Sequence, residues 1–108
     1  MTKIFCDIAD TKLIKKFNRK KIVKGFTTNP SLMRKAGAKN YSKYGKEILN
    51  ITNKPVSFEV FADDFQNMIL QGNKINHWGK NVYVKVPVTN TKGRFTGSVI
   101  KTLNKKKI

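Results

Sequence analysis

The sequence predicts an α/β fold in which a parallel sheet is wrapped by helices. Four apolar, strand-like runs alternate with segments of helical periodicity. The strand-like runs begin about 20 to 30 residues apart, which is the length of one strand–helix unit. Repeated units of this kind pair their strands in parallel, because each connecting helix crosses over a face of the sheet. A chain of 108 residues is long enough for one domain or part of one.

The first half of the chain is predicted to hold two strands and three helices. Asp10 and Thr11 are good N-cap residues for the first helix. Asn29 and Pro30 prevent a helix from running through this point, and the proline suits the first turn of a new helix. The predicted elements are a strand at 3–9 whose apolar run ends at Asp7, a helix at 10–20, a strand at 22–26, a short helix from Pro30 that Gly37 ends, and a helix at 40–52.

The second half is predicted to hold two strands, each followed by a helix. Pro55 interrupts the helical pattern before the third strand, and Asp63 and Asp64 can cap the helix after it. A proline also closes the fourth strand-like run. The predicted elements are a strand at 56–62 with Glu59 at its centre, a helix at 65–75, a turn at 77–80, a strand at 82–88 with Lys85 in its middle, and a helix at 97–103.

The chain is strongly basic, with 23 Lys and Arg against six Asp and Glu and a net charge of +17. Such an excess indicates an anionic partner, either a nucleic acid or a small substrate such as a sugar phosphate. The lysines are spread along the chain, and their abundance together with Asn and Ile is also typical of coding bias. No nucleic-acid-binding motif is visible. A basic nucleic-acid-binding module therefore stays as the alternative function, and no specific nucleic acid is expected.

Cysteine usage and hydropathy argue against several classes of protein. Cys6 is the only cysteine and His77 the only histidine, so an internal disulfide is impossible and a zinc site is not expected. The N-terminus lacks the pattern of a signal peptide, and no apolar stretch approaches the ~20 residues of a membrane helix. We expect a cytoplasmic protein with no membrane association and no metal or other cofactor.

Lys85 is the single cation in the apolar run NVYVKVPVT. Such runs are typical of parallel strands that are covered on both faces. Burial of an ammonium group is costly unless the group is paired or loses its proton. Removal from water therefore favours the neutral amine, which is the form that attacks a carbonyl. Lys85 is then either a surface residue on an edge strand or a lysine that forms a Schiff base.

Each predicted strand carries or leads to one polar residue, in order Asp7, Asn29, Glu59 and Lys85. In a barrel of parallel strands, the carboxyl ends of the strands converge on one face, where active sites are built. Taken singly, the aspartate is typical of a helix cap and the glutamate of a solvent-facing strand residue. Together, the four residues offer an amine for an imine with a ketose, two carboxylates for proton transfer and an amide for substrate hydroxyls.

Four segments, IFCDIAD, GFTTNPSLMRKAG, VSFEVFADD and NVYVKVPVT, resemble the opening half of the transaldolase family, including its small fructose-6-phosphate-aldolase-like branch. The combination of TTNPS with KVPVT at this separation is the most specific part of the resemblance, which covers essentially the whole chain. It implies a TIM (β/α)8 barrel that works without a metal. It also implies transfer of a dihydroxyacetone unit from sedoheptulose 7-phosphate to glyceraldehyde 3-phosphate in the pentose phosphate pathway.

The resemblance also implies a role for each residue of the set. Lys85 matches the Schiff-base lysine, and Asp7 matches the aspartate that handles the proton on the hydroxyl beside the cleaved bond. Glu59 matches the carboxylate that works through a water molecule during imine formation. The aldolase-like branch tends to place a glutamine there, so Glu59 favours transfer over the alternative of a fructose-6-phosphate-type aldolase. The residues implied in substrate binding are Asn29, Thr28 and Thr27 of the TTNPS motif.

The length of the chain departs from the family pattern. An eight-unit barrel needs roughly 200 residues or more, whereas residues 1–108 supply about four units, so we expect an incomplete barrel that corresponds to the N-terminal half. The groups that bind the substrate phosphate in the family cannot be mapped onto this chain. An inactive, truncated enzyme therefore remains an alternative. An open half-barrel exposes apolar surface. We therefore expect the chain to have low stability or to self-associate when it is alone. Its expected partner is either further copies of the chain in a homo-oligomer or a complementing C-terminal half.

Overall fold

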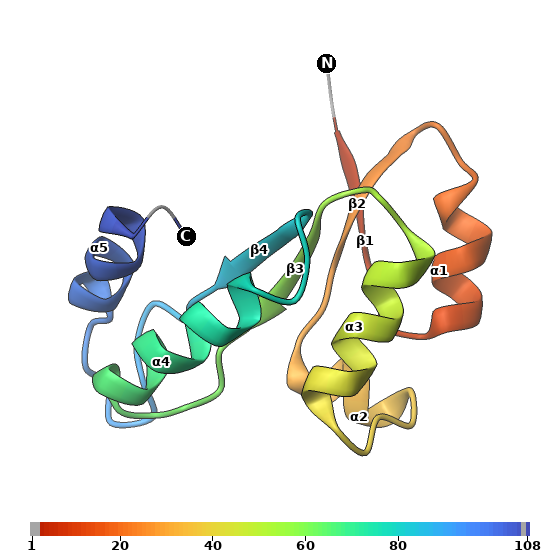
Figure 1. Cartoon of the computed structure of the whole chain (residues 1–108). Coiled ribbons are helices and arrows are strands. Elements are labelled where there is room, and N and C mark those ends of the chain that lie inside the picture. The colour runs from red at the N-terminus through yellow and green to blue at the C-terminus, as the bar shows by residue number, and fades with distance from the viewer. Residues whose placement is uncertain (1–2, 107) are drawn as a thin grey trace.

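Four parallel strands and five helices make up the part of the chain that the structure describes (Figure 1). The structure is a computed structural model and describes residues 3–106 and 108. The strands lie side by side in chain order, which confirms the predicted α/β fold and corresponds to half of a (β/α) barrel. The strands are β1 (Ile4–Asp7), β2 (Val23–Thr27), β3 (Val56–Glu59) and β4 (Val82–Lys85), and the helices are α1 (Thr11–Asn18), α2 (Pro30–Lys35), α3 (Tyr41–Ile51), α4 (Phe65–Asn76) and α5 (Gly97–Lys105).

Short polar side chains begin four of the five helices. Each side chain accepts a hydrogen bond from a backbone N–H two or three residues further along, a group that has no partner inside the helix. The capping residues are Asp10 for α1, Asn29 for α2, Asn40 for α3 and Asp64 for α4. Gly37 follows α2 with a φ of 99°, a conformation that favours glycine. None of the described helices is both long and apolar enough to cross a membrane.

The strands β3 and β4 end earlier than the sequence predicts. Their ladder stops at Glu59 and Lys85, whereas the predicted strands run to residues 62 and 88. One further backbone bond links them, from the N–H of Val60 to the carbonyl of Lys85 at 3.0 Å. Beyond it, Pro87 has no N–H to offer a ladder. As a result, Glu59 and Lys85 lie at the ends of their strands and not in the middle.

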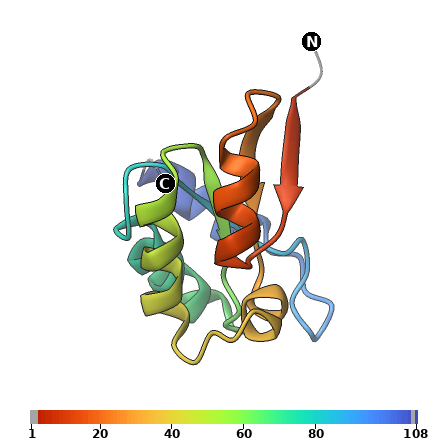
Figure 2. The ribbon, with the colours of Figure 1, turned by 90° about the vertical axis from the view of Figure 1, so that its right-hand side faces the viewer.

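The helices cover one face of the sheet, and the apolar core lies between them and the strands. In Figure 2, α1, α3 and α4 lie to the same side of β1. Alternate strand residues such as Phe26, Val56 and Phe58 are almost fully buried, together with Ile14 of α1 and Ile48 of α3. This face therefore holds the contacts that stabilise the fold.

The opposite face of the sheet is open. Phe5 on β1 and Tyr83 on β4 expose 52% and 62% of their surface. The expectation that the strand around Lys85 is covered on both faces is therefore wrong for the described chain. The reason is that the strands that would oppose this face in a closed barrel are not among the described residues.

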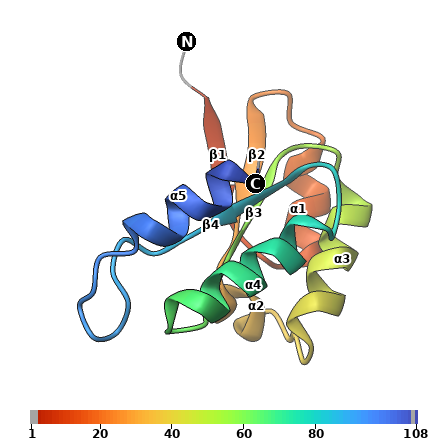
Figure 3. The same cartoon turned by 60° about the vertical axis from the view of Figure 1, so that its left-hand side comes forward.

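Strand β4 lies at one edge of the sheet, with α4 packed against both β4 and α5 (Figure 3). A groove of about 540 Å³ runs between β4 and α5, and its lining includes Lys85, Val86 and Ile100. An edge strand presents backbone N–H and C=O groups that can pair with another strand.

Candidate active site

Lys85 and Glu59 form the one ion pair among the described residues. They are the last residues of the adjacent strands β4 and β3 and are partners in the parallel register. The Nζ atom of Lys85 lies 4.0 Å from Oε2 of Glu59, and the two side chains are 38% and 31% exposed. An amine and a carboxylate at this separation can exchange a proton through one intervening water molecule.

Lys85 has features that fit both hypotheses left open by the sequence, a surface lysine on an edge strand and a Schiff-base lysine. It belongs to an edge strand of the described sheet and is partly exposed, as the surface hypothesis expects. Its amine lies 4.0 Å from the carboxylate of Glu59 at the neighbouring strand end, as the Schiff-base hypothesis expects.

Asp7 and Thr27 form a second pair, across β1 and β2. They are register partners, and the hydroxyl of Thr27 donates a hydrogen bond to Oδ1 of Asp7 at 2.8 Å. Asp7 is exposed and Thr27 is half-buried. The hydrogen bond orients the carboxylate, whose second oxygen can take a proton from a ligand.

The next two residues of the TTNPS motif make local contacts. Thr28 is fully buried, and both its hydroxyl and its backbone N–H donate to the carbonyl of Ser57, at 2.8 and 3.1 Å. These two bonds tie β2 to β3. Asn29 caps α2 through its side-chain oxygen, which lies 2.9 Å from the backbone nitrogen of Leu32. The structure thus places Thr28 between strands and Asn29 at the junction of β2 and α2, with its amide held in one orientation.

The strand register arranges the paired residues in two successive rows. Asp7, Thr27 and Ser57 are partners across β1, β2 and β3. Glu59 and Lys85 are partners two residues further along β3. Side chains two residues apart on a strand point to the same face, roughly 6.5 Å apart. The two carboxylates and the amine therefore share the open face of the sheet.

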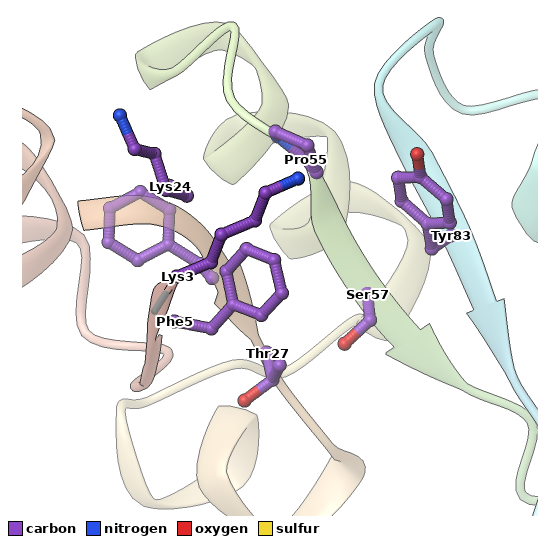
Figure 4. Close-up of a pocket in the computed structure, with 8 residues that line it drawn as sticks. Lys3, Phe5, Lys24, Thr27, Pro55, Ser57 and Tyr83 are labelled. Carbon is purple, nitrogen blue, oxygen red and sulfur yellow. The ribbon is translucent and has the colours of Figure 1, made fainter. Parts of the chain in front are cut away.

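A cavity of about 560 Å³ lies on this open face, beside the first row (Figure 4). Each strand contributes at least one lining residue: Phe5, Thr27, Ser57 and Tyr83 come from β1, β2, β3 and β4 in turn. Glu59 and Lys85 do not line it. The cavity is therefore the interior of the half-barrel, and the paired amine and carboxylate stand beyond it at the carboxyl ends of the strands.

Ser57 is a residue of this face that sequence reasoning missed. Its hydroxyl oxygen is buried and has no hydrogen-bond partner among the described residues. A buried hydroxyl without a partner costs about 1–3 kcal/mol, which a bound water or substrate group would recover. The signal in the sequence was its position two residues before Glu59, because this spacing places both side chains on one face of a strand.

Tyr41 was also missed, and it supports the backbone at Glu59. Its hydroxyl donates to the Glu59 carbonyl at 2.9 Å, although the two residues lie on different elements. Its ring packs edge-on against Trp78 and Phe58, with centroids 5.3 and 6.4 Å away. Burial raises the pKa of Tyr41 above its ordinary value, against the opposing effect of the hydrogen bond, so the hydroxyl stays a neutral donor. No pattern in the sequence indicated this contact.

The site thus brings together an amine paired with a carboxylate, a second carboxylate paired with a hydroxyl, and an amide that follows β2. The family model described as Transaldolase/Fructose-6-phosphate aldolase matches residues 4–108. The chain belongs to this family. Membership confirms the resemblance seen in the sequence.

Three relatives of the transaldolase/aldolase family, each named "Probable transaldolase", show how much of such a protein the chain represents. The relative from Nitrosopumilus maritimus is 45% identical over 87 residues, which are 81% of this chain and 39% of the relative. The relatives from Methanococcus maripaludis (strain DSM 14266) and Clostridium acetobutylicum are 41% and 40% identical over 87 residues, which are 81% of this chain and 40% of each. The match thus spans about 40% of the length of these relatives.

Proposed function

We propose that the chain supplies the imine-forming part of a transaldolase-type active site. The observation that carries this proposal is the pair of Lys85 and Glu59, 4.0 Å apart at neighbouring strand ends. The proposed donor is sedoheptulose 7-phosphate and the proposed acceptor is glyceraldehyde 3-phosphate, both sugar phosphates of the pentose phosphate pathway. We expect the protein to act in the cytoplasm, where such sugars are processed.

The first proposed step joins the substrate to Lys85. The neutral amine attacks the ketose carbonyl and forms a carbinolamine. Glu59, through a water molecule, delivers the proton that lets the carbinolamine hydroxyl leave as water. The product is a protonated imine. Glu59 lies close enough to Lys85 to accept a proton from the ammonium form through one water molecule as the amine becomes reactive.

The second proposed step breaks a carbon–carbon bond. Asp7 takes the proton from the hydroxyl beside the scissile bond, and an aldehyde forms and leaves as the bond breaks. The bonding electrons pass to the imine nitrogen and leave an enamine of the dihydroxyacetone unit. Thr27 holds Asp7 in place through its 2.8 Å hydrogen bond. Attack of the enamine on the acceptor aldehyde and hydrolysis of the new imine complete the transfer.

Substrate binding is assigned to the TTNPS segment. Asn29 would donate from its amide nitrogen to a substrate hydroxyl, since its side-chain oxygen caps α2. Thr27 borders both the Asp7 pair and the open-face cavity. Thr28 acts in this proposal by holding β2 against β3.

The open face and the edge of β4 require a partner for this chemistry. We propose that the partner is a polypeptide equivalent to the part of the relatives that this chain does not match, which is more than half of their length. Parallel strands from this partner would pair with the β4 edge and cover Phe5 and Tyr83. A second copy of the chain fits less well, because two copies would bring together net charges of +17 each.

Borohydride trapping tests the proposed function. The chain, complemented with the C-terminal part of one of the relatives, is incubated with fructose 6-phosphate or dihydroxyacetone and reduced, and its intact mass is measured. The wild type should gain the mass of the reduced adduct, Lys85→Ala should gain none, and Lys80→Ala should behave as the wild type. An equal adduct on Lys85→Ala, or no adduct on the complemented wild type at saturating substrate, would overturn the proposal.

The alternative activity within the same family is simple aldol cleavage of fructose 6-phosphate. The residue that separates the two proposals is Glu59, which favours transfer. In an assay with fructose 6-phosphate alone and with an added acceptor, we expect product only when the acceptor is present. The Glu59→Gln variant should shift the balance toward release of free dihydroxyacetone.

A further inference from the structure

We infer that the outer face of α1 binds the phosphate backbone of double-stranded nucleic acid, a function separate from sugar chemistry. Five cationic residues, which we call the α1 basic stripe, surround a shallow depression of about 520 Å³ there. All five are exposed. They are Lys12, Lys15 and Lys16 in the helix, Arg19 at its C-cap and Lys20 directly after it.

The spacing of the α1 basic stripe matches a regular row of anions. Positions 12, 15, 16 and 19 are related by steps of three and four residues, so they share one helical face. At 1.5 Å per residue, Lys12 and Arg19 are about 10 Å apart along the axis. A nucleic-acid strand carries one phosphate per 3.4 Å of duplex axis and winds around that axis, so successive phosphates are further apart in space than this rise. With its long side chains, the stripe reaches about three of them.

The sequence around the α1 basic stripe is rich in cations and lacks acids. Residues 11–46 contain 12 of the 23 Lys and Arg and no Asp or Glu. The acids that bracket this segment are Asp10, whose carboxylate is occupied in capping α1, and Glu47 of α3. Among the described residues, none of the five cations forms a salt bridge. Their field is therefore available to an external anion.

The end of the stripe is held in place by a polar network. The Nζ of Lys54 donates to the backbone carbonyls of Asn18 and Lys20 at 2.8 and 2.9 Å. The side chain of Asn18 in turn donates to the carbonyl of Ile51 and accepts from the hydroxyl of Thr52. These bonds anchor the carboxyl end of α1 to the segment between α3 and β3. The backbone that carries the stripe therefore needs no ordering when a ligand binds.

The composition of the stripe favours a duplex backbone over other anionic partners. Phe17, the aromatic residue of α1, is half-buried and lies under the ammonium of Lys16, 5.8 Å from its ring centroid, so it offers no platform for stacking unpaired bases. The lining of the depression is entirely Lys and Arg. Interfaces with proteins are poor in lysine and rich in aromatic anchors. An acidic protein is therefore the less suitable partner.

The test compares two variants that lose the same charge in different places. One replaces the five stripe residues by Gln, which retains helix propensity. The matched control replaces five exposed lysines of the other half of the chain, Lys74, Lys80, Lys92, Lys101 and Lys105, by Gln. Affinity for a labelled 20-base-pair duplex is measured by fluorescence anisotropy from about 50 to 200 mM salt, and circular dichroism checks both folds.

We expect the stripe variant to bind about tenfold more weakly or worse, with the slope of log affinity against log salt reduced by about three. The control should change the slope by less than about one. Acetylation mapping on the wild type should show the duplex protecting Lys12, Lys15, Lys16 and Lys20. Equal losses in both variants, no loss in the stripe variant, unprotected stripe lysines, or tighter binding to polyglutamate than to the duplex would each overturn the inference.

Discussion

The two faces of the same four strands have opposite characters. On the helix-covered face, Phe58 and Val56 are fully buried in a continuous core. On the open face, Phe5 and Tyr83 are more than half exposed, and the paired polar residues stand on the same side. Alternate residues of one strand therefore serve two purposes. The covered face stabilises the fold, and the open face presents the groups proposed for chemistry.

Substitutions on the two faces should have different effects. A change on the covered face should alter the free energy of unfolding, whereas a change on the open face should alter reactivity or association. The neighbouring residues Thr27 and Thr28 show the contrast within one motif, since the first bonds to Asp7 and the second to a backbone carbonyl in the sheet.

The largest expected effect is the loss of a core ring. Phe58 is fully buried and packs edge-on against Trp78 with centroids 5.1 Å apart. Phe58→Ala should lower the free energy of unfolding by about 3–5 kcal/mol. Tyr83→Ala, on the next strand but on the open face, should lower it by less than about 1 kcal/mol. Urea unfolding followed by circular dichroism measures both, and similar losses would mean that the two faces do not differ.

A smaller effect should separate the two threonines. Thr28→Val should cost about 1–2 kcal/mol, because it removes a buried hydroxyl that bonds β2 to β3. Thr27→Val should cost less than about 1 kcal/mol, because its hydrogen bond to Asp7 lies at the surface. The order should reverse for the rate of carbon–carbon bond cleavage in the complemented protein, because Thr27 holds the proposed base Asp7 in place. The reverse ranking in unfolding would contradict the assignment of the faces.

Tyr41, on the helix-covered side, should make the free energy of unfolding depend on pH. Burial raises its pKa in the folded chain above the ordinary value of 10.0, so above pH 10 the unfolded chain loses this proton first. The stability that Tyr41 contributes is complete below pH 10 and falls as the pH rises further. Tyr41→Phe should flatten this fall, and it should also lose about 1 kcal/mol at neutral pH with the bond to Glu59. Unfolding by urea between pH 8 and 11 checks both; an unchanged slope would refute the burial argument.

The smallest effect on stability is expected from the exposed rings. The double variant Phe5→Ser and Tyr83→Ser should unfold with nearly the wild-type free energy, since both rings are mostly exposed. It should bind an apolar dye such as anilinonaphthalene sulfonate more weakly and self-associate less. Leu70→Ser, at another exposed position on α4, is the control and should leave both properties unchanged. Equal dye binding in all three proteins would contradict an apolar open face.

The sequence was sufficient for features that depend on neighbouring residues. The caps at Asp10 and Asp64 and the glycine after α2 follow from local backbone chemistry, and the four strands follow from apolar runs. The alternation of residues also indicates which side chains share a face, but not which face is open. The exposure of Tyr83 depends on what packs against the open face, and no described element does so.

Features that depend on distant contacts were not predicted. The ends of β3 and β4 are set by where the two strands stop pairing, and this depends on both of them. The bond from Tyr41 to the Glu59 carbonyl joins residues 18 positions apart. The hydroxyl of Ser57 is unpaired because it has no hydrogen-bond partner among the described residues. Such contacts leave no periodic signal in a single sequence.

The most direct test of the central claim is to map the borohydride-trapped adduct onto the lysines of the complemented protein. After reduction with dihydroxyacetone bound, peptide mass spectrometry assigns the modified side chain. We expect modification at Lys85 alone, with its amount strongly reduced by Glu59→Ala. Modification spread over the exposed lysines, or concentrated at any lysine other than Lys85, would contradict the claim.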